Sequence, residues 1–389
     1  MNGRKIRVAY FTHYADLYGA NRSLLDLVVE LRDRGLVEPF VICAAEGPLT
    51  DRLKQLGIDQ AIVPFSMWMA KRVYMGRPHH RLVQWLGYRK ASRERLRKDK
   101  ALVPRLAQLI RERRIEVLHV NSSVIGIGHL LQQKLKLPLV WHVRELVFKH
   151  YGLHPDVGFS GFRRALLKAD RVIAISDAVK QELGGLKNCV VIHNGIISDE
   201  AYRQRMDRKP RFAGDPFTFT LIGYFHKSKG QIEAIEAFAE VKERAPQVKL
   251  LIAGSGNAKE IRARVDSLGI ANAVEFAGFV NDPDRLYERT DVLLNCSRHE
   301  ALGRVTIEAM FHRVPVIGHA SGATPELIQH GRTGFLYHTP EELAAAMMRM
   351  LQQPQLRSEM GEEAFRTLGD RFSVQARSQD VHRLYMELV

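Results

Sequence analysis

The stretch that decides the fold is Asp291-Val-Leu-Leu-Asn-Cys-Ser-Arg-His-Glu-Ala-Leu-Gly-Arg-Val-Thr-Ile-Glu308. Its first six residues are mostly apolar, and we expect a buried strand over 291–296. A short loop ending in Gly303 follows, and then a helix that contains Glu308. A buried strand that leads into a helix through a short loop is typical of a parallel sheet covered by helices.

The same alternation extends in both directions from this stretch. On the N-terminal side, strands are expected at 6–12, 39–44, 58–64, 115–121, 137–142, 171–175 and 189–193, with a helix at 20–34. On the C-terminal side, strands are expected at 217–224, 248–253, 273–276, 291–296 and 314–318, with helices at 230–244, 258–268, 284–288, 305–312 and 325–329. The polar interval 198–216 is the expected linker, and the chain from Pro340 onward has a helical pattern. The sequence thus predicts an α/β protein of two tandem, doubly wound, Rossmann-like domains facing across a cleft.

The composition excludes several classes of protein. The chain has 389 residues, a net charge of +15 and 46% hydrophobic residues, so it can bury two cores. It has no apolar run of the ~18–20 residues that a membrane-spanning helix needs and no signal-peptide core. Its three cysteines, Cys43, Cys189 and Cys296, lie in or beside apolar segments, and we expect buried thiols of a reducing, cytoplasmic compartment.

Positive charge is concentrated between Phe65 and Lys100, a stretch that contains eleven Lys or Arg residues and only two acidic residues. Aromatic and methionine side chains are interleaved with these cations. Such a mixture suits an anionic membrane surface, and nucleic acid or an ordinary solvated helix face are the alternatives. We predict peripheral attachment to the inner face of a membrane and expect no nucleic-acid partner. The candidate residues for the membrane or an acceptor are Trp68, Lys71, Arg72, Arg77, Arg81 and Trp85.

The chemistry-bearing residues follow predicted strand ends in the C-terminal half. Glu300 and Glu308 flank Gly303, where the free N–H groups of a helix start can bind an anion while carboxylates bind hydroxyls. Lys229 follows another strand in a tight loop, and Gly254-Ser255 ends a third. Taken alone, two acids at this spacing are weak evidence of a binding site, because one can be a solvent contact of a loop and the other a surface charge of a helix.

In this order the motifs resemble those of the retaining glycosyltransferases of family 4, which have the GT-B architecture. The resemblance covers nearly the whole chain and is most specific at the E-x7-E pair, Glu300 and Glu308. It implies a UDP- or GDP-sugar donor, with Glu300 at the reacting sugar, Lys229 on the diphosphate and Glu308 on the ribose. It further implies that donor contacts come from Gly19, Ala20, Gly254, Ser255, Phe279, Val280, Leu302 and Gly303.

The resemblance also implies an active-site histidine, His142, and a division of the chain into three segments. These are an acceptor-binding domain at 1–197, a nucleotide-sugar-binding domain at 217–371 and a closing helix at 372–389 that packs back across the domains. The chain departs from the family at Tyr224, where an arginine is common, and at Tyr18, where the first of two glycines is common. Neither departure removes the glutamate pair or the lysine.

Other enzyme classes fit the sequence less well. No G-x-G-x-x-G follows the first strand and no G-x-x-x-x-G-K-[ST] occurs, which counts against a dinucleotide oxidoreductase and a P-loop NTPase. No histidine spacing indicates a metal, and Asp282 is interpreted as a helix N-cap. We therefore predict sugar transfer without a metal or other cofactor to a hydroxyl of a lipid-linked or cell-envelope glycan. The alternatives are another GT-B nucleotide-sugar enzyme, an epimerase or hydrolase, and a non-catalytic protein that binds membrane or nucleic acid.

Overall fold

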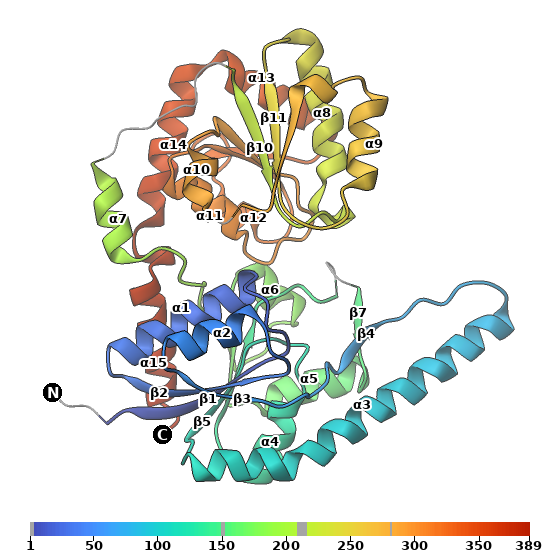
Figure 1. Cartoon of the computed structure of the whole chain (residues 1–389), viewed down its shortest axis with the longest axis vertical. Helices are drawn as coiled ribbons and strands as arrows, with labels where there is room; N and C mark the ends of the chain where they lie inside the picture. The colour runs from blue at the N-terminus through green and yellow to red at the C-terminus, as the bar shows by residue number, and fades with distance from the viewer. Residues whose placement is uncertain (1–3, 149–151, 208–215, 281) are drawn as a thin grey trace. The chain divides into compact units, whose positions relative to one another are not determined.

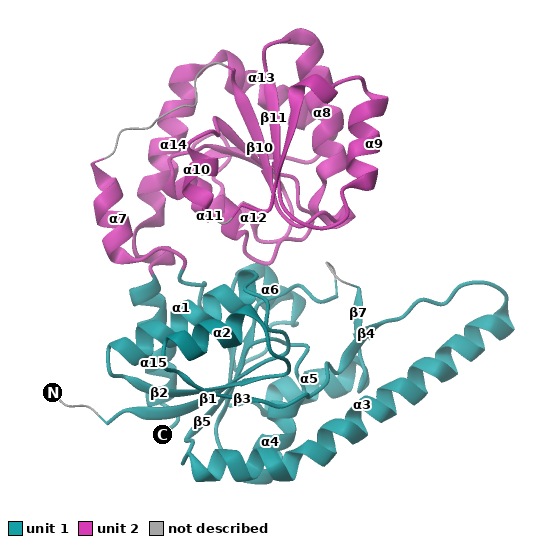
Figure 2. Ribbon diagram, viewed as in Figure 1, with its two compact units in different colours: residues 1–195, 374–389 teal, residues 196–373 magenta. Residues whose placement is uncertain are grey.

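The structure, a computed structural model, describes residues 4–148, 152–207, 216–280 and 282–389. The chain divides into two compact units, one of residues 1–195 and 374–389 and one of residues 196–373 (Figure 2). No helix among the described residues has the length and apolarity needed to cross a membrane.

Unit 1 contains a parallel sheet of seven strands in the order β3-β2-β1-β5-β6-β8-β9. Figure 1 labels β1, β2, β3 and β5 of this sheet. Its elements are β1 (Ile6–Thr12), α1 (Gly19–Asp33), β2 (Val37–Cys43), α2 (Pro48–Gln55), β3 (Asp59–Ile62), β4 (Met69–Lys71), α3 (Pro78–Glu112), β5 (Val117–Val120), α4 (Ile127–Leu135), β6 (Leu139–Val143), β7 (Leu153–Pro155), α5 (Gly158–Lys168), β8 (Arg171–Ala174), α6 (Asp177–Glu182), β9 (Cys189–Val191) and α15 (Val374–Met386). Alternate residues of these strands pack on apolar side chains of α1, α2 and α15, so the closing helix is part of this core.

Unit 2 contains a parallel sheet of six strands in the order β12-β11-β10-β13-β14-β15. Its elements are α7 (Asp199–Met206), β10 (Thr218–Ile222), η1 (Lys227–Lys229), α8 (Gln231–Arg244), β11 (Lys249–Ala253), α9 (Lys259–Ser267), η2 (Ala271–Ala273), β12 (Val274–Gly278), α10 (Pro283–Tyr287), β13 (Val292–Asn295), α11 (Arg304–Phe311), β14 (Val316–His319), α12 (Thr324–Leu327), β15 (Gly334–Tyr337), α13 (Pro340–Gln352), α14 (Pro354–Leu368) and η3 (Gly369–Phe372). Helices α8, α9 and α13 cover one face of the sheet with a continuous apolar core.

The alternation of strands and helices predicted for both halves is confirmed, with end shifts of a few residues. The three cysteines are buried and free, and Asp282 caps α10 by accepting from the Asp284 N–H at 3.2 Å. Four short elements, α7, β15, β4 and β7, and the arm at the start of α3 escaped prediction. The expected linker contains α7, whose first turn is capped by Ser198. Strand β15 and the antiparallel pair β4–β7 are only three or four residues long, too short for a periodic pattern.

Candidate functional site

The order of the strands in unit 2 defines where a ligand can bind. From β10 the chain moves outward through β11 and β12, and it then returns to the other side of β10 to form β13. Such a reversal opens a crevice at the carboxyl ends of the two central strands. The loop after β10 carries Lys229 and the loop after β13 carries Glu300, so topology directs both residues to this point.

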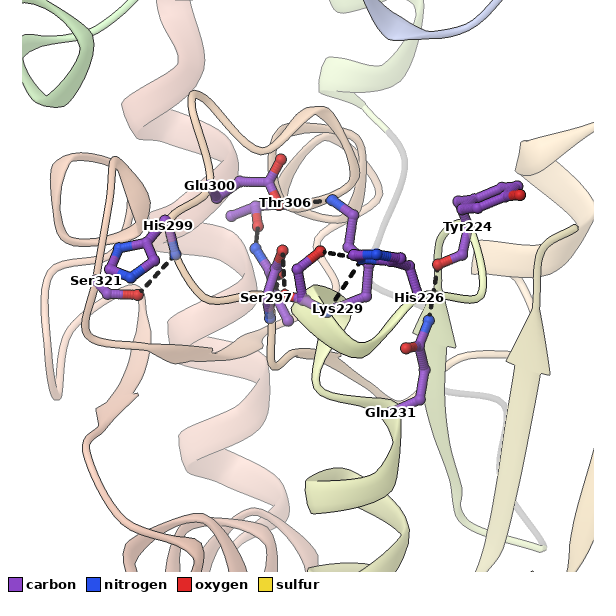
Figure 3. Close-up of polar contacts among 11 residues, drawn as sticks. Tyr224, His226, Lys229, Gln231, Ser297, His299, Glu300, Thr306 and Ser321 are labelled. Carbon is purple, nitrogen blue, oxygen red and sulfur yellow. Dashed lines mark hydrogen bonds and ion pairs between the residues drawn. The ribbon is translucent and has the colours of Figure 1, made fainter. Parts of the chain in front are cut away.

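Lys229 and Glu300 form an ion pair at that edge of the sheet. The Lys229 Nζ lies 2.9 Å from a Glu300 carboxylate oxygen, and the side chains are 27% and 17% exposed (Figure 3). The two loops are joined by a hydrogen bond of 3.0 Å from the Arg298 N–H to the Ser228 carbonyl. Gly230 permits this approach, because a Cβ there would lie 2.2 Å from the Cys296 carbonyl oxygen.

The backbone at Glu300 is held in an uncommon conformation. His299 has φ +59°, a left-handed value that costs a residue with a side chain of order 1 kcal/mol or more. The His299 N–H donates to the Ser321 Oγ at 3.1 Å (Figure 3), and the Glu300 carbonyl accepts from the Ala323 N–H at 2.8 Å. These contacts hold the backbone at Glu300, and the ion pair with Lys229 orients its carboxylate.

Helix α11 begins immediately beyond this loop at Gly303, whose φ is +89°. No side chain caps the helix, and its first turn contains no acid, so the positive end of its dipole is available for an anion. Leu302 is buried beside this turn. Glu308 lies one turn further, where it accepts from the Tyr287 hydroxyl at 3.3 Å and pairs with Arg304 at 3.6 Å.

The other predicted donor residues of unit 2 lie at the carboxyl ends of the adjoining strands. Gly254 and Ser255 follow β11, and the Ser255 carbonyl accepts from the Phe225 N–H at 2.8 Å. Phe279 and Val280 follow β12, and the Phe279 ring is exposed. Tyr224, in the place of the family's arginine, is also exposed. These residues surround the carboxyl edge at which Lys229 and Glu300 meet, and their roles stay predictions.

In unit 1, His142 is the penultimate residue of β6 and lies within a buried polar cluster. The Arg144 guanidinium donates to the Asn121 Oδ1 at 2.6 Å and to the His142 Nδ1 at 3.2 Å, and it also donates to Asn194. These residues are nearly fully buried. Burial, followed by the charge of Arg144, lowers the pKa of His142 well below its ordinary value, so the ring is neutral.

This cluster borders a small pocket that also belongs to unit 1. His142, Arg144 and Asn194 form one side of it, and Arg377 and Ser378 of α15 contribute to another. Among the described residues, the His142 Nε2 is a buried atom with no hydrogen-bond partner. A buried nitrogen without a protein partner, on a residue that lines a pocket, can bind a ligand or a water there.

Sequence reasoning missed Arg144 as a candidate functional residue. A pattern in the sequence could have indicated Arg144. A polar residue lies just beyond the end of each of β5, β6 and β9, and parallel strands bring their carboxyl ends together. These residues are Asn121, Arg144 and Asn194. Glu145 is structural: its carboxylate accepts from the hydroxyls of Ser122 and Ser123 at 2.6 and 2.7 Å. Burial raises the pKa of Glu145 although these bonds favour its charged form.

The N-terminus of α1 has the predicted position. Gly19 and Ala20 are its first two residues, and no side chain caps the helix. The loop before it is held by the Asn21 side chain, which donates to the Tyr14 and Asp16 carbonyls at 2.9 and 2.8 Å. Donor binding by these amides stays a prediction.

One membrane candidate is wrong. Trp68 is only 8% exposed, stacks on Trp141 at 5.4 Å and donates its indole N–H to the Ser123 carbonyl, so it belongs to the core. The others lie at the surface: Lys71, Arg77, Arg81 and Trp85 are exposed, and Arg72 packs over the Tyr88 ring. Among the described residues, no group of three metal-binding side chains comes together.

Comparison with protein families gives two matches. The model for group 1 glycosyl transferases matches residues 203–367, and the model for glycosyltransferase family 4 matches residues 18–200. Among curated proteins, the chain is 24% identical over 307 residues to N-acetyl-alpha-D-glucosaminyl L-malate synthase of Bacillus anthracis, covering 75% of this chain and 80% of that protein. It is 23% identical over 290 residues to alpha-monoglucosyldiacylglycerol synthase of Acholeplasma laidlawii, covering 67% and 73%.

Among solved structures, the fold resembles that of Anabaena HepE in complex with UDP. The TM-score is 0.77 with 22% identity, and the match covers 98% of this chain and 100% of that one. The same protein with UDP-glucose gives a TM-score of 0.75. At this identity the likeness concerns the fold alone, and it extends over both units.

Proposed function

The chain belongs to the family-4 glycosyltransferases and has their GT-B fold, and on that basis we propose that it transfers a sugar from a UDP- or GDP-sugar to an acceptor hydroxyl with retention of configuration. The observation on which the proposal depends is the Lys229–Glu300 pair at the strand-order reversal of unit 2, beside the uncapped start of α11. An ammonium, backbone amides at a helix start and a carboxylate are the groups that a sugar diphosphate needs. The Anabaena protein of the same fold is described with UDP and with UDP-glucose.

In the proposed reaction the bond between the sugar carbon and the diphosphate oxygen breaks, and a bond from that carbon to the acceptor oxygen forms. The acceptor's proton passes to the departing phosphate oxygen. Negative charge grows on the diphosphate, where Lys229 and the amides after Gly303 would stabilise it. Glu300, freed from Lys229 when the donor enters, would hold the sugar and offset positive charge at the reacting carbon without forming a covalent bond. Same-face attack by the acceptor would give retention, and no step requires a metal.

A thermal-shift panel of nucleotide sugars tests the donor. We expect a higher melting temperature with one UDP- or GDP-sugar, because a ligand at 100 times its Kd stabilises by about 2.7 kcal/mol. NMR of the product with that donor then gives the anomeric configuration. An inverted product would contradict the mechanism, and release of free sugar at the same rate without acceptor would identify a hydrolase instead. If no nucleotide sugar raised the melting temperature, the proposed donor site would be contradicted.

The proposed acceptor is a lipid-linked or cell-envelope glycan, reached from an anionic membrane surface. The first three turns of α3 and the loop before them form an arm that projects from the rest of unit 1 (Figure 1). Its exposed apolar residues are Val73, Met75, Leu82, Val83, Trp85 and Leu86, and its exposed cations are Arg77, Arg81, Arg89 and Lys90. Apolar side chains among cations are suited to the boundary between lipid headgroups and acyl chains. The Acholeplasma relative is named for a glycolipid product.

The arm is fixed at its base, which leaves its outer part free to meet a surface. Arg95 binds the buried Asp156 carboxylate with two bonds of 2.8 and 2.6 Å, and the Tyr88 hydroxyl lies 3.2 Å from the His154 carbonyl. The loop is joined to the helix by the Met75 N–H, which donates to the Gln84 Oε1 at 2.8 Å. The exposed apolar side chains therefore extend from a rigid support.

Liposome flotation tests the arm. The full chain should float with vesicles of anionic and neutral lipid at low salt, and binding should weaken as salt rises. Trp85→Ser with Leu86→Ser, and separately Arg77→Glu with Arg81→Glu, should reduce binding, since each basic residue near such a surface contributes about 1 kcal/mol. The control, Arg111→Glu on the same helix but outside the arm, should bind as the wild type does. Failure of the wild type to float at low salt would refute the proposal.

A further inference from the structure

The C-terminal helix contributes a tyrosine to the buried cluster around His142. The Tyr385 hydroxyl lies 2.6 Å from the Nδ1 of His119, and the His119 Nε2 lies 3.3 Å from the Nδ1 of His142. All three side chains are buried, and all belong to unit 1. A continuous hydrogen-bonded chain thus runs from α15 through β5 to the end of β6.

The direction of each hydrogen bond follows from Arg144, which can only donate. Its Nη2 lies 3.2 Å from the His142 Nδ1, so that nitrogen must accept and the His142 proton must be on Nε2. The His119 Nε2 faces the same accepting atom and must therefore carry a proton. The neutral His119 ring then has a bare Nδ1, and only a donor can satisfy it. The Tyr385 hydroxyl is that donor: its one proton goes to the His119 Nδ1 at 2.6 Å, so in the longer contact of 3.4 Å with the Tyr10 hydroxyl Tyr385 accepts.

We propose that Tyr385, acting through His119 and together with Arg144, is a positioning residue that holds His142, a residue lining the pocket of unit 1, in the tautomer with its proton on Nε2. In this state His142 is a hydrogen-bond donor to an oxygen of the bound substrate and not a base. The unpartnered Nε2 at the pocket agrees with this role, because a donor with no protein partner is available for a ligand. The part that concerns turnover rests on the proposed sugar transfer, whereas the part that concerns the tautomer does not.

A neighbouring tyrosine provides a matched control. The Tyr10 hydroxyl lies 3.4 Å from that of Tyr385 and is equally buried, but its contact to His119 is through the ring, at 5.1 Å between centroids. Tyr385→Phe and Tyr10→Phe each remove one buried hydroxyl and keep the aromatic ring. Only Tyr385→Phe removes the donor to His119, so a general loss of stability would affect both variants alike.

The first measurement is nitrogen-15 NMR of histidine-labelled full-length protein, with the His142 and His119 signals assigned from His142→Asn and His119→Gln variants. We expect both rings to be neutral with the proton on Nε2 in the wild type and in Tyr10→Phe. In Tyr385→Phe the His119 Nδ1 has no donor, so the His119 tautomers should become mixed, and the His142 ring, still held by Arg144, should populate its second tautomer to a smaller extent. A His142 proton on Nδ1 in the wild type, or the same spectrum in Tyr385→Phe, would overturn the proposal.

The second measurement is steady-state turnover with the donor found by thermal shift. Tyr385→Phe should lower kcat by about tenfold, equivalent to roughly one hydrogen bond, and leave KM for the donor nearly unchanged. Tyr10→Phe should retain wild-type kcat. Equal kcat in the two variants would overturn the positioning role. If the wild type turned over no nucleotide sugar, the proposed function would fail, and the NMR result would still decide the tautomer.

Discussion

Replacement of Lys229 by alanine separates a diphosphate-binding lysine from a structural one. In the free protein Lys229 pairs with Glu300 at 2.9 Å, and both side chains are partly buried. A charge-assisted hydrogen bond to a phosphate is worth about 1.5–3 kcal/mol. If Lys229 holds the leaving diphosphate in the transition state, Lys229→Ala should lower kcat/KM by about 10- to 150-fold.

The same change should have a small effect on folding. Loss of a partly exposed ion pair costs about 1 kcal/mol, against a total stability of roughly 5–15 kcal/mol. For a unit of this size that corresponds to a fall of about 2–4 °C in Tm. The variant should therefore be folded at assay temperature, and the loss of turnover cannot be attributed to unfolding.

The assay is release of the nucleoside diphosphate from the donor found by thermal shift, with Tm measured on the same samples. Lys227→Ala is the control, because Lys227 is exposed, lies on the same 3-10 turn and carries the same charge. It should change kcat/KM by no more than about twofold, since the field of an exposed charge is screened by solvent and salt. Equal kcat/KM in the two variants would refute a specific role for Lys229.

Three further predictions concern other parts of the molecule. Glu300→Gln keeps the shape of the side chain and removes its charge; it should lower kcat by about 100-fold in a folded protein, and unchanged turnover would contradict the assignment. Gly303→Ala places a Cβ at φ +89°, and denaturant unfolding should show a loss of about 1–2 kcal/mol together with weaker donor binding. Burial and the charge of Arg144 lower the pKa of His119 and of His142 in the folded protein. In the unfolded chain both rings take up a proton near pH 6.5, so the free energy of unfolding should be greatest above about pH 6.5. Below that pH it should fall by up to about 1.4 kcal/mol per pH unit for each histidine. Denaturant unfolding at pH 7 and pH 5 measures this dependence, and His119→Gln should remove one histidine's share of it; a dependence equal to that of the wild type would contradict the burial argument.

Local patterns were sufficient to predict most of the strands and helices. Runs such as those at Ile6–Thr12 and Lys249–Ala253 are apolar because parallel strands are covered on both faces, and this requirement is visible in the sequence. The arm and the pair β4–β7 were not predicted, because an exposed helix and two three-residue strands lack an apolar period. Trp68 was predicted to lie at the surface because its stacking partner, Trp141, is distant in the sequence and no local pattern indicates that the two rings meet.

By itself the sequence determined the α/β alternation, the two sheets and the residue types that bind phosphate and hydroxyls, since these depend on periodicity and on local motifs. Only the tertiary structure decided which of those residues meet. Lys229 and Glu300 are 71 positions apart and are brought to 2.9 Å by the strand order, and Tyr385 reaches His119 across 266 positions because α15 packs on the first unit. Strand order and helix docking result from burial of many apolar side chains together, so no short segment of the chain encodes them.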